Sequence, residues 1–309
     1  MRKTPVLIKY TPHGVNTRFF KPLTEDEKST KEFLEFKQQL NADDYEFIVF
    51  FNSRNMRRKQ IPDTIYSWKL FLDRLPKEKA EKCLLLLHTQ PVDDNGTDIP
   101  AVVEYFFGKG TKNVKLSAQR FPPHILNYLY NIADLQILLS SNEGWGLSLT
   151  EAMAAGTPIL ANVQGGMQDQ MRFEDSEGKW LNFSKELPSN HTGVIKTHGR
   201  WAFPVFPNNR SLQGSPMTPY IWDTRCTPED VVTQLLVAYQ YGRQQLKEFG
   251  LEASEWVRSE EAGLTAKMMG ENIIEGLNKL FETWEPREQF ELINSTKLNK
   301  ENKYNCILL

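Results

Sequence analysis

Five short apolar segments, separated by amphipathic ones, constrain the fold of this chain more than any other feature of its sequence. Residues 45–51, 83–88, 113–116, 134–140 and 157–163 have the length and composition of β-strands. Between them, apolar residues follow the 3.6-residue spacing of helices. Strands that alternate with helices and are apolar on both faces form parallel sheets covered by helices. The sequence therefore predicts an α/β, Rossmann-like domain with helices on both faces.

Several helix starts are recognisable. Thr24 and Glu27 form a capping box, which predicts one helix running to about residue 40. Pro62 and Pro123 begin two further helices, and Thr227 caps a long one near the end of the chain. We expect residues 1–285 to form one domain and residues 286–309 a polar tail.

An interruption at residues 178–222 breaks the strand–helix alternation. This stretch is rich in Pro, Gly, Asn and aromatic residues, which predicts an ordered insertion rather than disorder. Its aromatic part, residues 201–222, is a candidate acceptor wall or docking surface for a partner.

Charge and cysteine content exclude several classes of protein. The net charge of −2 gives no overall basic field for nucleic acid. Three widely separated cysteines fit neither a disulfide framework nor a zinc cluster. No apolar run reaches membrane-spanning length, so we expect a cytoplasmic protein. The ending Cys306-Ile-Leu-Leu fits a prenylation signal, which would allow peripheral membrane contact, although chance explains four residues more simply.

The segment that carries chemistry begins at Glu143. This carboxylate lies in the loop after a predicted strand, and Glu151 follows eight residues later inside a helix that should begin near Gly146. Gly144 and Gly146 permit close backbone approach, and free amides at a helix start suit a diphosphate. One carboxylate would then grip a sugar and the other a ribose. Taken alone, two such glutamates are also explained by helix capping and a solvated helix face. The polar run at residues 93–96 is a turn or a metal loop; we favour the turn and expect no required metal.

This segment resembles the retaining glycosyltransferases of family 4, which have the two-domain GT-B fold. Their donor half carries Glu-Gly-Phe-Gly-Leu…Glu-Ala-Met-Ala-X-Gly-X-Pro, and here Trp145 replaces the Phe. The resemblance implies that Glu143 contacts the donor hexose at the catalytic centre. It also implies that the amides around Leu147 and Ser148 meet the phosphates, and that Glu151 holds the ribose hydroxyls.

A second match lies after the first predicted strand. Residues 52–60 resemble the family's Gly-Arg-Leu-X-X-X-Lys-Gly, with Arg54 and Lys59 at the same separation. The resemblance implies that these two cations clamp the diphosphate as catalytic residues. Arg57 or Arg58 are alternatives for this role, and a solvated basic loop is the simpler interpretation of the cluster.

Weaker matches complete the comparison. Arg120 lies where the family flanks the nucleotide base, and Gly165-Gly166 match a double glycine near the donor. Residues 12–22 resemble the segment that joins the two GT-B halves. Because this segment lies close to Met1, we expect this chain to be the donor half alone, without the acceptor-binding half.

The residues alone indicate a site for a sugar diphosphate or nucleotide. The resemblance implies a hexosyltransferase that takes a UDP- or GDP-linked sugar and transfers it to a hydroxyl with retention. Two alternatives remain open. One is a non-catalytic nucleotide-sugar-binding subunit that needs a separate acceptor-domain protein, and the other is a GT-B-type epimerase or phosphorylase.

Overall fold

A six-stranded parallel sheet forms the centre of the molecule, in a computed structural model that describes residues 7–182, 187 and 191–284. Its strand order is β3-β2-β1-β4-β5-β6. The strands are β1 (Phe47–Asn52), β2 (Cys83–His88), β3 (Val114–Ser117), β4 (Leu135–Leu138), β5 (Ile159–Asn162) and β6 (Ala202–Val205). All five strands expected from the sequence are present, and the Rossmann-like fold is confirmed.

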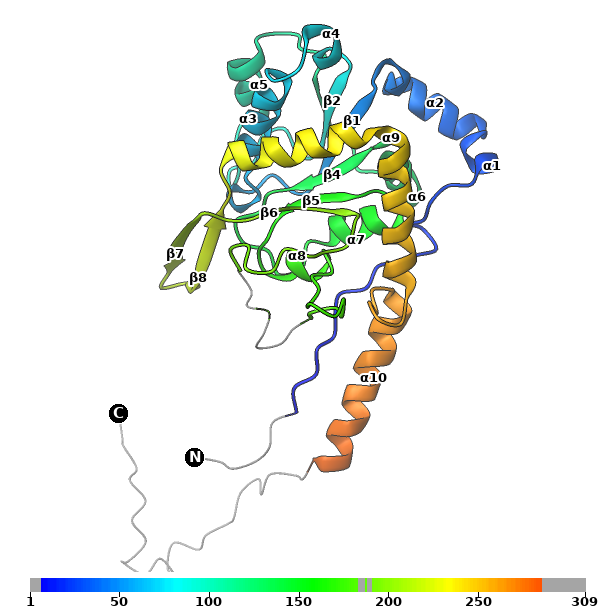
Figure 1. Ribbon diagram of the computed structural model, residues 1–309, viewed down its shortest axis with the longest axis vertical. Coiled ribbons are helices and arrows are strands. Elements are labelled where there is room, and N and C mark those ends of the chain that lie inside the picture. The colour runs from blue at the N-terminus through cyan, green and yellow to red at the C-terminus, as the bar shows by residue number, and fades with distance from the viewer. Residues whose placement is uncertain (1–6, 183–186, 188–190, 285–309) are drawn as a thin grey trace, which may run out of the picture.

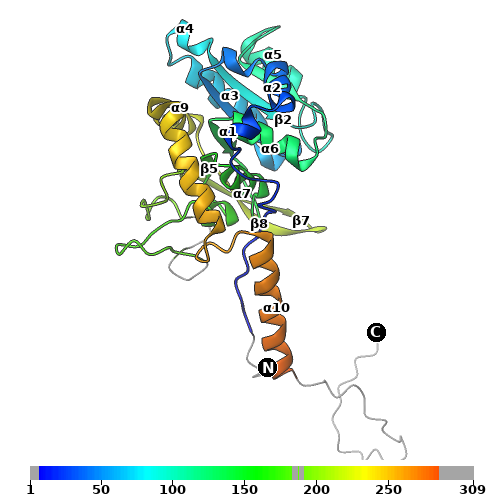
Figure 2. The same cartoon turned by 90° about the vertical axis from the view of Figure 1, so that its right-hand side faces the viewer.

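Helices flank this sheet on both sides (Figures 1 and 2). The helices between strands are α3 (Ile61–Leu72), α4 (Lys77–Ala80), α5 (Ile99–Phe107), α6 (Pro123–Ile132), α7 (Leu147–Ala154) and α8 (Gly166–Asp169). Short 3₁₀ turns lie at Ala42–Asp44 and Arg57–Lys59. Apart from the edge strand β3, of which only Val114 is buried, the strands are buried almost throughout because both faces are covered.

The first helical region differs from the expectation of one helix. The capping box of Thr24 and Glu27 is present, but it begins the single turn α1 (Glu25–Lys28). A second helix, α2 (Lys31–Gln39), starts anew at Thr30, whose extended backbone and side chain cap the amide of Phe33. A good N-cap residue inside a helical pattern thus restarts the helix.

The expected insertion contains a strand of the central sheet. β6 pairs in parallel with β5, from Ile159 opposite Ala202 to Asn162 opposite Val205, and all four of its residues are buried. It is an edge strand and contains Pro204. Assigning residues 201–205 to a surface insertion was therefore wrong. Four residues with a central proline carry too little pattern to be recognised as a strand.

The rest of this region includes an exposed hairpin, β7 (Asn209–Ser215) and β8 (Thr218–Arg225). Arg210 lies over the ring of Trp222 at 4.4 Å. The amide of Thr224 donates to the carbonyl of Ser141 at 2.9 Å and anchors the hairpin to the loop after β4. The hairpin thus projects from the carboxyl edge of the sheet (Figure 1).

Two long helices end the described chain. α9 (Pro228–Arg258) bends at Gly242, whose φ of 75° is not helical. α10 (Ala266–Thr283) extends away from the body, and none of its residues is buried (Figure 2). No helix of the described residues is long and apolar enough to cross a membrane. The predicted polar tail and the Cys306 motif lie outside the described residues.

Candidate functional site

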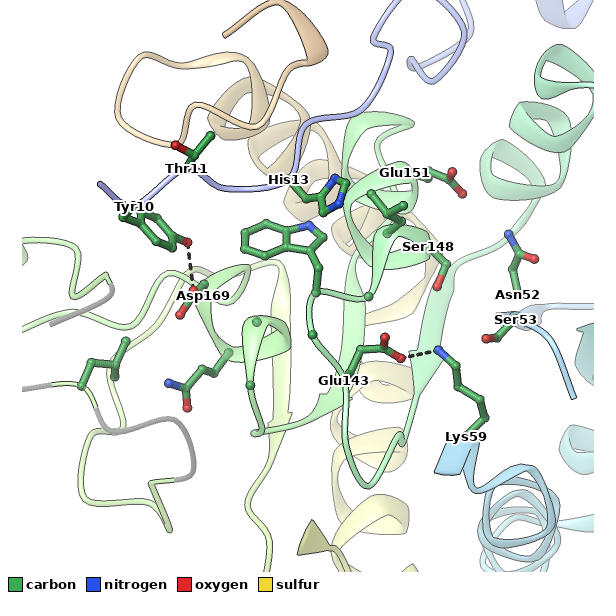
Figure 3. Close-up of a pocket in the computed structure, with 18 residues that line it drawn as sticks. Tyr10, Thr11, His13, Asn52, Ser53, Lys59, Glu143, Ser148, Glu151 and Asp169 are labelled. Atoms are coloured by element: carbon green, nitrogen blue, oxygen red, sulfur yellow. Dashed lines mark hydrogen bonds and ion pairs between the residues drawn. The ribbon is translucent and has the colours of Figure 1, made fainter. Parts of the chain in front are cut away.

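A pocket of about 960 Å³ opens at the carboxyl edge of the sheet (Figure 3). The loops after β1, β4 and β5, the start of α7 and the segment at residues 10–13 line it. In Rossmann-like sheets ligands bind at this edge. The lining includes nine residues predicted from the sequence: Lys59, Glu143, Gly144, Gly146, Leu147, Ser148, Glu151, Gly165 and Gly166.

The start of α7 faces this pocket. The helix begins at Leu147, as expected, and Gly146 precedes it with a φ of 86°. This left-handed conformation suits glycine. No acidic residue lies in the first turn, and no side chain caps it. The first amides and the positive end of the helix dipole are therefore available to an anion.

Gly165 and Gly166 bring two loops together. A Cβ atom on Gly165 would lie 2.2 Å from the carbonyl oxygen of Glu143, and one on Gly166 would lie 2.3 Å from that of Gly144. Both distances are below any real contact. The double glycine therefore lets the loop after β5 pack directly against the backbone of the loop after β4, which an ordinary turn does not require.

Buried hydrogen bonds hold this loop in place. The indole of Trp145 donates to the hydroxyl of Thr150 at 2.9 Å, and that hydroxyl donates to Gln170 at 2.7 Å. The amide group of Gln170 returns to the carbonyl of Trp145 at 2.6 Å. This closed network fixes the backbone that leads into α7.

Glu143 faces Lys59 across the pocket (Figure 3). Both side chains are mostly buried, and Lys59 donates a hydrogen bond to Oε2 of Glu143. Arg58 donates to the same oxygen at 2.8 Å. Burial alone would raise the pKa of Glu143, but the two cations hold it below its ordinary value. The site thus contains an ionised carboxylate with two cations beside a helix start.

Glu151, which lies in α7, has a different environment from Glu143 in the preceding loop. Tyr130, which is fully buried, donates to Oε2 of Glu151 at 2.7 Å, and Asn52 donates to the tyrosine oxygen at 2.8 Å. Burial raises the pKa of Glu151 to about 7, and the hydrogen bond from Tyr130 opposes that shift. No cation of the described residues forms an ion pair with this carboxylate.

Two predicted residues lie beside the pocket rather than in it. Arg54 donates from Nε to Asp93 at 3.1 Å and is more than half exposed. Arg54 and Arg120 line a neighbouring cavity of about 470 Å³ beyond β2 and β3. This cavity shares Asn52 and Ser53 with the larger pocket. Of the two cations expected to act together, the structure therefore puts Lys59 in the pocket and Arg54 outside it, with Arg58 next to Glu143.

The far end of the pocket contains residues that sequence reasoning missed. The hydroxyl of Tyr10 donates to Asp169 at 2.9 Å (Figure 3). Thr11, His13 and Gln168 also line the pocket. Burial raises the pKa of Asp169 to about 6, opposed by this hydrogen bond. Asp169 follows the double glycine by three residues, which was the one local signal for it.

Part of this chain matches a known family of proteins. Residues 110–180 match the family model Glycosyl transferases group 1. This group 1 segment covers β3, α6, β4, α7 and β5, and so contains Glu143, Glu151 and the double glycine.

Two relatives of this chain are described as glycosyltransferases. The chain is 26% identical over 176 residues to a D-inositol 3-phosphate glycosyltransferase of Salinispora arenicola. The aligned region covers 56% of this chain and 38% of that protein. It is 32% identical over 98 residues to an uncharacterized glycosyltransferase of Methanocaldococcus jannaschii, which covers 32% of this chain and 24% of that protein. The matched part of the chain thus covers well under half of the length of each of these relatives.

Solved structures share the fold over a longer part of the chain. A sucrose-phosphate synthase of Thermosynechococcus elongatus matches with a TM-score of 0.55 and 19% identity, over 89% of this chain and 53% of that one. Anabaena HepE, in complex with UDP and glucose, matches with a TM-score of 0.55 and 15% identity, over 86% and 56%. These structural matches confirm the Rossmann-like fold of the chain. The chain spans about half the length of these structures.

Proposed function

We propose that this chain is a glycosyltransferase that binds a UDP- or GDP-linked hexose in the pocket of Figure 3 and transfers the hexose to a hydroxyl with retention. The observation that carries this proposal is the ion-paired group of Glu143, Lys59 and Arg58 beside the uncapped start of α7. The group 1 segment and its glycosyltransferase relatives support it. The spacing of Glu143 and Glu151 supports placement in family 4.

Each group has a role in this proposal. The diphosphate lies at the amides of Leu147 and Ser148, and Lys59 and Arg58 neutralise it. As the bond from the anomeric carbon to the phosphate oxygen breaks, the nucleoside diphosphate leaves with the electron pair, and these groups stabilise its charge. The acceptor oxygen bonds to the same face of the sugar and gives its proton to the departing phosphate.

The two carboxylates bind opposite ends of the donor. Glu143 accepts hydrogen bonds from hydroxyls of the hexose, and Glu151 accepts them from hydroxyls of the ribose. A diphosphate competes with Glu143 for the same two cations, so binding redistributes the hydrogen bonds of Lys59 from carboxylate to phosphate. The pocket volume of about 960 Å³ is suitable for a nucleotide sugar.

A thermal-shift series tests donor binding. UDP or GDP should raise the unfolding midpoint, because a ligand that prefers the native state stabilises it. The variant Lys59→Met should lose this shift, whereas Lys82→Met, which removes an exposed lysine paired with Glu46, should keep it. If no nucleoside diphosphate or nucleotide sugar shifts the midpoint, the pocket is not a donor site.

The acceptor wall is proposed to come from a second polypeptide. Large apolar residues of α10 and its end are 43–69% exposed: Ile273, Ile274, Leu277, Leu280, Phe281 and Trp284. Thr11 lines both the donor pocket and the groove along α10. A domain packed on this helix would therefore stand beside the donor.

Transfer assays of the 309-residue chain test this second part. The chain alone should bind the donor but transfer sugar very slowly, because catalysis between two domains depends on aligning the acceptor and excluding water. Turnover of about 1–10³ s⁻¹ without another protein would contradict the partner requirement. Donor binding without transfer in any combination would favour a non-catalytic subunit. The anomeric configuration of the product, measured by NMR, decides retention.

A further inference from the structure

A second cavity, of about 460 Å³, lies at the opposite edge of the sheet from the donor pocket. Ile48, Asp134 and Pro158 line it, and these residues lie at or just before the starts of β1, β4 and β5. Residues of α1, α2 and the second arm of α9 complete its wall. We refer to it as the amino-edge pocket. It shares no lining residue with the donor pocket.

The bend in α9 builds this pocket. Gly242, with φ 75° and ψ 164°, turns the helix so that its second arm runs close to α1 and α2 (Figure 1). Arg243 follows at once and binds Asp134 in a two-pronged ion pair, with Nε to Oδ1 at 2.7 Å and the second nitrogen to Oδ2 at 3.0 Å. One turn later, Lys247 reaches the pocket.

The charged lining of the pocket is unbalanced. Four cations face two carboxylates in it: Lys28, Lys37, Arg243 and Lys247 against Glu25 and Asp134. The whole chain, by contrast, has a net charge of −2. Lys37 is also paired with Asp43, which lies outside the lining, so four cations face three carboxylates and the local excess is one positive charge.

Ion pairs within the pocket leave Lys247 beside another cation. Asp134 is bonded to Arg243, and Glu25 to Lys28 at 2.9 Å. Lys247 and Lys28 line the same pocket, and the nearby Lys28, together with burial, lowers the pKa of Lys247. Two neighbouring ammonium groups repel each other. An anion between them would turn this repulsion into two charge-assisted hydrogen bonds.

The pocket also has an apolar floor. Phe33 and Ile48 are buried there, and Leu251 lies at the edge. Its volume is in the range of small-molecule sites. A matching ligand has a dianionic group for the lysine rim and a ring or hydrocarbon body for the floor. A phosphate monoester carries about 1.5 to 2 negative charges at neutral pH and three acceptor oxygens, so it can bond to Lys28 and Lys247 at the same time.

We propose that the amino-edge pocket binds a phosphate monoester with an apolar body, and that Lys28 and Lys247 hold its phosphate. The shared chemistry allows two sources, a soluble metabolite or the headgroup of an acidic lipid. This site is separate from the proposed donor site and does not depend on it.

Binding of phenyl phosphate, measured by calorimetry on the full chain, tests the proposal. The double variant Lys28→Gln/Lys247→Gln should lose at least tenfold in affinity, because each charge-assisted contact contributes about tenfold. A matched double variant, Lys69→Gln/Lys82→Gln, removes two surface lysines elsewhere and should bind as the wild type does. Lys59→Met should also leave binding unchanged, which separates this pocket from the donor site. Circular dichroism verifies that each variant is folded.

Flotation with phosphatidylcholine vesicles, with and without phosphatidate, identifies the source. Phenyl phosphate binding without flotation supports a soluble ligand, and flotation that depends on Lys28 and Lys247 supports a lipid headgroup. The proposal is overturned if neither probe binds, or if binding is lost in Lys59→Met and kept in the Lys28/Lys247 variant.

Discussion

Replacing Glu151 with glutamine should stabilise this protein at pH 8 and lose that effect at pH 5. In the folded chain burial raises the pKa of Glu151 from 4.5 to about 7. Above pH 7 the side chain is therefore ionised in a place that favours its neutral form. At about 1.4 kcal/mol for each pKa unit, the ionised carboxylate costs about 3 kcal/mol of folding stability.

The sign follows from proton binding. Between pH 4.5 and 7 the folded state holds a proton on Glu151 that the unfolded state releases, so the cost is present in full above pH 7. It decreases as the pH falls and disappears below the unfolded value. Glutamine is neutral at every pH. It is also a poorer partner for the hydroxyl of Tyr130, which offsets about 1 kcal/mol.

Thermal unfolding of Glu151→Gln therefore should show a midpoint about 4–8 °C above wild type at pH 8, from a net gain of about 2 kcal/mol. At pH 5 the two proteins should differ little. Glu143→Gln is the matched control, and it should destabilise at pH 8 because it leaves Lys59 buried without its partner. A gain for Glu151→Gln of equal size at both pH values, or a loss at pH 8, would refute the assigned environment.

Three further predictions concern the donor pocket. The double change Lys59→Ala/Arg58→Ala should lower UDP or GDP affinity at least tenfold by calorimetry, whereas Arg54→Ala should change the affinity little. Equal losses of affinity would show that Arg54 also binds the diphosphate. Glu143→Gln should weaken binding of the nucleotide sugar but not of the plain nucleotide, and parallel losses for both ligands would contradict the division of roles. Gly166→Ala should lower stability by about 1–3 kcal/mol in denaturant unfolding, because its Cβ meets the carbonyl of Gly144; a neutral change would show that the loops separate easily.

Sequence reasoning brought together most of the lining of the proposed donor pocket because its parts follow one rule. Lys59, Glu143 and Gly165 come after β1, β4 and β5, and the carboxyl ends of neighbouring parallel strands meet at one edge. Spacing along one helix then put Glu151 on the same side. These relations are local or follow from the sheet, so the order of residues carries them.

Other features depend on contacts that no local pattern encodes. Tyr10 meets Asp169 across 159 positions of sequence, and nothing near either residue points to the other. The position of Arg54 was missed because Asp93, in a turn after the next strand, binds it away from the pocket. Whether Arg54 or Arg58 lies beside Glu143 thus depends on which carboxylate each arginine pairs with, and these pairings are tertiary contacts.

The edge strand β6 also determines how this sheet ends. The carbonyls of Trp201 and Val205 accept hydrogen bonds from Ile159 and Val163 of the β5 side. Because peptide groups alternate along a strand, the nitrogen of Pro204 faces away from β5, where the sheet has no further strand and the nitrogen has no hydrogen to donate. Pro204 is buried, so an ordinary residue such as valine would place an amide hydrogen there without a partner in the sheet. Proline at this position therefore ends the ladder without leaving a buried donor unpaired, a cost of about 1–3 kcal/mol.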